Sequence, residues 1–169
     1  YRRVMIKKWV MLVLCLVAAG FTEDAQLTDA RRLVEQFMTA LKAELMVGMA
    51  EGGPERAIAV CSEKAPAVTA TMASNTHWEV SRTSLKPRNI GNTPDLWEAK
   101  VLRAFEHQMK SGADPKTLEF AEVVEGEYRY MKAIPTVALC LSCHGTGVSL
   151  PVQHKIDSLY PQVAMHMEG

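Results

Sequence analysis

The chain has 169 residues, in which 19 Lys and Arg balance 19 Asp and Glu, so its formal net charge at pH 7 is zero. A balanced charge gives no basis for binding nucleic acid or an acidic membrane surface, and we expect neither as a partner. A chain of this length suits one domain that buries a core of its own.

The first twenty residues have the pattern of an export signal. Residues 1–8 carry a cluster of cations, and residues 9–20 form an uncharged apolar run that ends in Ala18-Ala19-Gly20. This pattern is typical of a secretory signal peptide, whereas a permanent spanning helix needs about 20 apolar residues. We expect residues 1–20 to be a signal peptide, with translation from Met5, and residues 21–169 to be periplasmic or secreted. Membrane contact is then expected only through an uncleaved signal segment.

Two helices are predicted next. Apolar residues recur at steps of three and four, which predicts an amphipathic helix that ends near Gly48; they are Leu27, Ala30, Val34, Phe37, Leu41 and Leu45. Glu51-Gly52-Gly53 predicts a break, and Pro54 suits the first turn of a second helix that reaches about Lys64. Its apolar side carries Ala57, Ile58, Val60 and Cys61. Pro66 is expected to end this helix or to open another.

The middle of the chain alternates between loop and regular structure. Residues 78–84 alternate loosely and favour a strand, and the loop 87–94 is rich in turn residues. A helix is predicted from Pro94 or Asp95, with Thr93 as the candidate N-cap, and it ends at Ser111-Gly112. Its expected buried stripe is Leu96, Ala99, Leu102, Phe105 and Met109.

The last third of the chain predicts a hairpin and a short helix. Residues 118–124 and 128–134 read as strands around Glu125-Gly126-Glu127. Residues 152–159 favour a short helix. Internal repeats and linkers are absent from the sequence, so we predict one α+β domain.

Between the hairpin and this helix lies Cys140-Leu141-Ser142-Cys143-His144, a C-x-x-C-H motif that is typical of c-type haem attachment. Two thiols add to the two vinyl groups of haem, and the imidazole that follows becomes the proximal iron ligand. A zinc site needs four ligands, and a dithiol redox pair needs a βαβ context; the sequence offers neither. We therefore expect one covalent haem c on Cys140, Cys143 and His144.

The sixth iron ligand is open at this point. Cys61 is the cysteine of residues 21–169 that the motif does not use, and it is either a ligand or a small core residue. The alternatives are Met165, Met167, His77 and His154. A thiolate lowers the potential of haem iron, whereas methionine raises it.

Three cations, Arg82, Lys86 and Arg88, lie within seven residues of one another. Arginine pairs with carboxylates through bidentate hydrogen bonds, so these residues are candidates for binding the haem propionates. Fixing of the loop and simple solvent exposure are the alternatives. No residue is predicted to be catalytic, and we expect no enzymatic activity.

Four segments resemble a known family, the single-haem c-type PAS-like domains of secreted haem proteins and extracytoplasmic sensor modules. The segments are Ala57–Cys61 with Ala65-Pro66, Arg82–Lys86 with Arg88-Asn89, Asn92–Asp95 with Trp97-Glu98, and Cys140–Gly145 with Tyr160-Pro161. The resemblance implies a PAS-like antiparallel sheet flanked by helices. It also implies iron held by His144 and by a cysteine thiolate, for which Cys61 is the matching residue.

The chain departs from that family at two places. Ile90 stands where the family usually has proline, and the sequence after Tyr160-Pro161 stops short of the family's last strand. We therefore expect a truncated C-terminal strand. The resemblance implies a redox- or gas-responsive sensor domain with a diatomic gas as a candidate ligand and an unidentified redox or signalling protein as partner. A small electron-transfer cytochrome is the alternative, and a haem peroxidase is less favoured.

Overall fold

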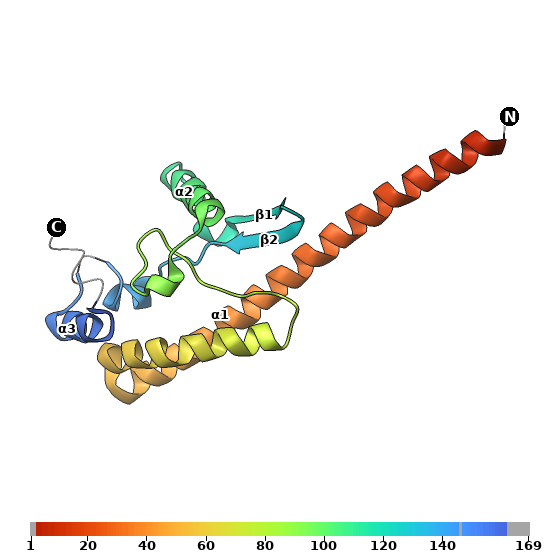
Figure 1. The fold of residues 1–169 in the computed structure, drawn as a ribbon. Helices are drawn as coiled ribbons and strands as arrows, with labels where there is room; N and C mark the ends of the chain where they lie inside the picture. The colour runs from red at the N-terminus through yellow and green to blue at the C-terminus, as the bar shows by residue number, and fades with distance from the viewer. Residues whose placement is uncertain (1–2, 146, 162–169) are drawn as a thin grey trace.

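The computed structural model describes residues 3–145 and 147–161, with side chains from Glu23 on (Figure 1). The elements in chain order are α1 Arg3–Ser74, η1 Ile90–Asn92, α2 Leu96–Lys110, η2 Pro115–Thr117, β1 Glu119–Val124, β2 Glu127–Lys132, η3 Ala138–Ser142 and α3 Leu150–Leu159. The predicted α+β class is confirmed. Within the described stretch, no helix has both the length and the apolar character that crossing a bilayer requires.

A sharp bend divides α1 into an N-terminal arm, residues 3–51, and a C-terminal arm, residues 54–74 (Figure 1). Gly53 has φ 66° and ψ −157°, a backbone conformation that favours glycine. The predicted break at Gly52-Gly53 is thus confirmed. The arms approach closely at Gly48, where an added Cβ would lie 2.8 Å from the Ala57 Cα.

The prediction for Pro66 was wrong, because the C-terminal arm runs through this residue to Ser74. The burial of one residue and one side-chain hydrogen bond explain why the helix continues. Ala65 is completely buried, and the Thr69 hydroxyl donates to the Ala65 carbonyl at 2.9 Å. Packing and a side-chain hydrogen bond therefore hold the helix on both sides of the proline.

α2 begins two residues later than the candidate N-cap Thr93 implied. Asp95 is the N-cap, and it forms a capping box in which Asp95 and Glu98 each accept from the other's backbone N–H. The Thr93 hydroxyl instead donates to the Ile90 carbonyl at 2.7 Å. Asp95 takes the cap because it alone has Glu98 three residues downstream.

The buried face of α2 is narrower than the sequence pattern predicted. It consists of Ala99, Val101 and Phe105, whereas Leu96 is 93 % exposed and Met109 is 40 % exposed. Val101 and Phe105 pack with Leu118 and Met131 of the hairpin region. The first turn of the helix also meets the hairpin, because the Trp97 indole N–H donates to the Glu122 carboxylate at 2.8 Å and Arg129 pairs with Asp95 at 2.7 Å.

The predicted hairpin is confirmed, although β2 begins one residue earlier and ends two residues earlier than predicted. β1 and β2 pair antiparallel, with Ala121 opposite Tyr130. Glu125 and Gly126 both have positive φ, 53° and 89°, as a two-residue turn of the I′ type requires.

The strand predicted over residues 78–84 is absent. The segment is irregular, and the sheet of the described residues consists of β1 and β2. The Trp78 indole N–H donates to the Asp29 carboxylate at 2.7 Å, and the Ser84 N–H donates to the Asn92 carbonyl at 3.3 Å. The segment finds these partners instead of a neighbouring strand. The PAS-like arrangement of the sheet remains a prediction.

The helix predicted over residues 152–159 is confirmed as α3. It packs against the C-terminal arm of α1 (Figure 1). Val152 and Ile156 are buried there together with Ile58. This small core holds together the two regions of the chain that carry the candidate iron ligands. The predicted C-terminal truncation concerns residues 162–169, which lie outside the described residues.

Candidate functional site

The C-x-x-C-H motif is a compact turn that starts in the 3₁₀ helix η3. The Cys140 N–H donates to the Val137 carbonyl at 2.8 Å. The Cys140 carbonyl in turn accepts from the N–H groups of Cys143, at 3.1 Å, and His144, at 2.7 Å. A single carbonyl therefore fixes both the spacing of the two cysteines and the position of the histidine backbone. Cys140 and Cys143 are free, half-buried thiols.

Cys61 lies across from this turn on the C-terminal arm of α1. It is half-buried, one turn beyond Ile58, and Cys143 packs against the core that Ile58 forms with α3. Burial raises the pKa of the Cys61 thiol, the Arg82 charge opposes that rise, and the Cys143 thiol adds to it. The fold thus brings Cys61, Arg82 and Cys143 within electrostatic range of one another.

His144 is exposed, yet neighbouring atoms remove enough water from its imidazole to lower its pKa. The positive charges of Arg88 and Arg82 lower that pKa further. Each effect favours the neutral ring, which is the form that offers a nitrogen lone pair to a metal. The free nitrogen is therefore available without first displacing a proton at neutral pH.

The loop cations separate into two groups. Arg82 and Arg88 are half-buried and act on the site, and the Arg88 guanidinium donates to the Cys143 carbonyl at 2.5 Å. Lys86 is exposed, and none of the charge effects resolved at Cys61, Cys143 or His144 comes from it. The structure brings the two arginines to the motif and leaves the lysine outside.

Tyr160 is a site residue that the sequence alone did not single out. It follows α3 directly and packs on the core of Ile58, Val152 and Ile156. Burial raises the pKa of its phenol, while the charges of Arg82 and Arg88 and the Ser62 hydroxyl lower it. The Tyr160-Pro161 pair after a helix was the available signal, but nothing in its spacing indicates which residues it meets.

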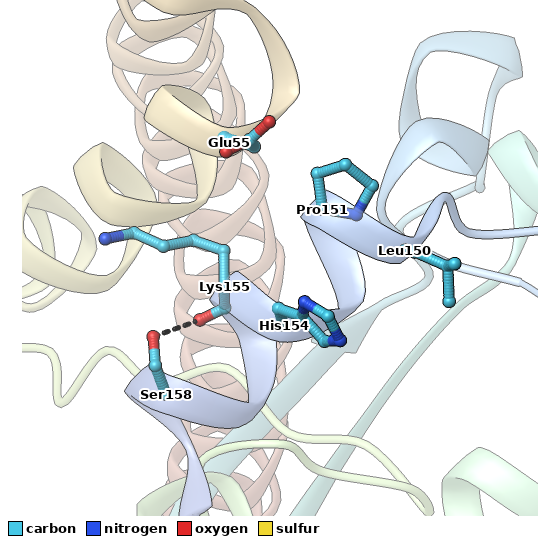
Figure 2. A pocket seen from close by; sticks show the side chains of 6 residues that line it. All are labelled: Glu55, Leu150, Pro151, His154, Lys155 and Ser158. Carbon is cyan, nitrogen blue, oxygen red and sulfur yellow. Dashed lines mark hydrogen bonds between the residues drawn. The ribbon is translucent and has the colours of Figure 1, made fainter.

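The rival iron ligands lie elsewhere or outside the described residues. His77 stacks on Trp78, with ring centroids 5.4 Å apart, near the end of α1. His154 is exposed on α3 and lines a surface depression of about 480 Å³ together with Glu55 and Lys155 (Figure 2). That depression includes none of the motif residues, nor Cys61. Met165 and Met167 lie outside the described residues.

The described residues do not gather three or more His, Cys, Asp or Glu side chains in the way that a protein-only metal centre requires. They offer fewer ligands: the imidazole of His144, and the Cys61 thiol, which a different segment of the chain brings within electrostatic range of Cys143. A group that brings its own equatorial ligands needs no more than two axial ones from the protein. This donor set suits haem better than zinc.

Comparison with known proteins places the chain in a family. The family model described as Tll0287-like matches residues 20–168. The match covers nearly the whole chain, so the chain belongs to this family, whose members are single-haem c-type domains. The resemblance inferred from the sequence is confirmed. No curated protein and no solved structure matches the chain.

The residues present fit a covalently bound haem. Cys140 and Cys143 are free thiols at the required spacing, and the neutral imidazole of His144 follows them. Exposed apolar side chains lie within and just before the motif, and they suit contact with an apolar porphyrin; they are Ile134, Val137 and Leu141, each at least half exposed. Two half-buried arginines lie near the motif, and arginine is the side chain best suited to the propionates.

Proposed function

We propose that this protein is a haem c protein that works as a redox- or gas-responsive sensor domain. Cys140 and Cys143 would hold the haem covalently, and His144 and Cys61 would be the two iron ligands that the protein supplies. The observation that carries the proposal is the convergence of Cys61 with the motif. Cys61 and Cys143 stand far apart in the chain, yet Cys143 packs on the core that Ile58, one turn before Cys61, forms with α3, and the Cys143 thiol acts on the pKa of Cys61.

When bound, haem supplies an iron centre that accepts and releases one electron. Cys61 acts on that centre through its charge. A buried thiol is normally protonated, but a facing ferric iron favours the thiolate, and the Arg82 charge favours it as well. A thiolate donor stabilises the ferric state, so the potential lies well below that of a His/Met cytochrome.

The sensing step is a change at Cys61. An electron delivered by a partner redox protein lowers the positive charge that faces the Cys61 sulfur. The Cys61 sulfur would then take up a proton or withdraw, and its ligand position would become available to a diatomic gas. Cys61 lies on the C-terminal arm of α1, so its release also changes how that helix packs against α3. A signalling partner is the proposed reader of that change.

The ferrous spectrum with and without carbon monoxide tests this function. Rapid binding of carbon monoxide to the reduced protein, accompanied by loss of the thiolate bands, supports a sensor. A reduced protein that stays six-coordinate and does not bind carbon monoxide contradicts it. That second result favours electron transfer, a role that agrees with the exposure of His144 and Leu141 at the surface. A peroxidase remains least favoured, because Cys61 occupies the face that peroxide would need.

Export and the PAS-like sheet belong to the same proposal. Haem c is attached outside the cytoplasmic membrane, so the motif requires a signal such as the one that residues 1–20 predict. A PAS-like sheet requires strands beyond β1 and β2 of the described residues. Recovery of a haem-loaded periplasmic protein that begins after about residue 20 tests the first point. A crystal structure of that protein tests the second.

A further inference from the structure

One long-range hydrogen bond ends on the haem-binding motif itself. The Arg88 Nη2 donates to the Cys143 carbonyl at 2.5 Å across 55 residues of chain. Cys143 is the C-terminal cap of η3, and a helix end leaves its last carbonyls without helical partners. Arg88 supplies that missing partner from a separate loop.

The loop that carries Arg88 is closed by its own hydrogen bonds. Asn89 accepts from the Gly91 N–H through its side chain and from the Asn92 N–H through its carbonyl, both at 2.9 Å. The Thr83 hydroxyl donates to the Asn92 carbonyl at 3.2 Å and so links the two ends of the loop. These bonds limit the loop's freedom, so Arg88 projects from a preformed support rather than from a free chain.

The bond matters because of the peptide group it holds. The Cys143 carbonyl and the His144 N–H belong to one planar peptide unit. Its N–H donates to the Cys140 carbonyl at 2.7 Å, and its carbonyl accepts from Arg88 at 2.5 Å. Both polar ends of this peptide are therefore held, by groups on opposite sides. The position of the His144 Cα relative to the motif is therefore held, which narrows the directions that its side chain can take.

We propose that Arg88 is a positioning residue, which fixes the Cys143–His144 peptide and thereby the direction in which the His144 imidazole leaves the backbone. The importance of Arg88 for haem binding rests on the proposed function. The hydrogen bond between Arg88 and Cys143 does not depend on that function. This role differs from pairing with a propionate, the first of the roles considered for this residue from the sequence. Arg82, whose charge acts on Cys61, His144 and Tyr160, is then the better propionate candidate.

Backbone amide hydrogen exchange on the full-length chain tests the proposal. In Arg88→Ala, the His144 amide should exchange at least tenfold faster than in the wild type, because its peptide has lost one of its two anchors. Amides of α2 and of the β1–β2 hairpin should keep their wild-type rates and thus report that the fold is intact. Lys86→Ala is the matched control, because Lys86 is an exposed cation of the same loop. It should leave the His144 amide unchanged.

Arg88→Lys keeps the test valid if Arg88→Ala does not fold. It retains the charge but replaces the planar fork with a single ammonium group. Exchange at His144 should then be faster than in Lys86→Ala, and the ferric EPR spectrum of haem-loaded protein should show a changed histidine orientation. A His144 amide that exchanges at the wild-type rate in folded Arg88→Ala or Arg88→Lys overturns the proposal and leaves Arg88 as a propionate partner.

The mass of the wild-type chain, recorded in the same experiment, separates this inference from the proposed function. A wild-type chain without haem after maturation contradicts the proposed function. The exchange rates remain decisive for Arg88 in either case, because they depend on a hydrogen bond between protein groups. A chain with haem and an unchanged His144 amide overturns the inference alone.

Discussion

The Arg31 guanidinium on α1 and the Glu119 carboxylate at the start of β1 form an ion pair that joins the N-terminal arm to the hairpin. Glu119 also accepts from the Tyr130 hydroxyl at 2.7 Å, and the Lys132 ammonium lies 3.6 Å away. The Arg31 hydrogen bonds, followed by that of Tyr130, lower the pKa of Glu119 to about 2. Glu119 is thus the point through which one arm of α1 is held against the sheet.

Glu119 makes the stability of the fold depend on pH. Because the pKa of Glu119 in the folded state lies below its ordinary value of 4.5, its contribution to stability is full above pH 4.5 and is lost as the pH falls toward about 2. Half-exposed Arg31 is screened by solvent, so we expect Glu119→Gln to lose no more than about 1 kcal/mol of unfolding free energy at pH 7. Urea unfolding at several pH values measures this. The exposed Glu106→Gln is the control, and equal losses in the two variants would contradict the prediction.

Gly48 lets the two arms of α1 approach each other. An added Cβ would lie 2.8 Å from the Ala57 Cα and 3.2 Å from a Val60 methyl group, so backbone would have to move. Gly48→Ala should therefore destabilise the protein by about 1–3 kcal/mol, which thermal unfolding detects. Gly147→Ala meets nothing within 4 Å and should stay within about 0.5 kcal/mol of the wild type. A stable Gly48→Ala protein would show that the arms do not pack this closely.

Cys61→Ala should keep the covalent haem and lose the low-spin thiolate signature of the ferric protein. The iron should become five-coordinate, or bind water or a nearby histidine. Cys61→Ser should behave similarly, because a neutral hydroxyl is a poor iron ligand. EPR and optical spectra measure the change. His77→Ala and His154→Ala should leave the spectrum as it is, and an unaltered spectrum in Cys61→Ala would reduce Cys61 to a core residue.

Arg82→Gln should lower the reduction potential of the haem-loaded protein by roughly tens of millivolts. The reason is that the Arg82 charge acts on both Cys61 and His144, and a positive charge near the iron favours the reduced state. Potentiometric titration gives the shift. Lys86→Gln removes a charge of the same sign from an exposed position nearby. A shift as large in Lys86→Gln as in Arg82→Gln would mean that only net charge matters.

The parts of the structure that could be predicted from the sequence are those with local causes. The hairpin follows from its turn residues, the bend in α1 follows from Gly52-Gly53, and the haem motif is a five-residue pattern with a covalent reason for its spacing. Each of these depends on residues that are neighbours in the chain.

The failures have long-range causes. Alternation over residues 78–84 suits a strand, but a strand needs a partner, and Trp78 instead bonds to Asp29 from 49 residues away. Pro66 reads as a helix boundary, yet packing at Ala65 carries the helix through it. The contact of Arg88 with Cys143 spans 55 residues, so spacing could show that the loop is cationic but not which cation meets the motif.

The intact mass of the mature protein tests the central claim most directly. The chain is expressed with a haem c assembly system and purified from outside the cytoplasmic membrane, together with a Cys140→Ala/Cys143→Ala variant. We predict that the wild type carries the mass of one haem through denaturation, whereas the variant carries none. A wild-type chain of unmodified mass, under conditions that mature other c-type cytochromes, would contradict the account.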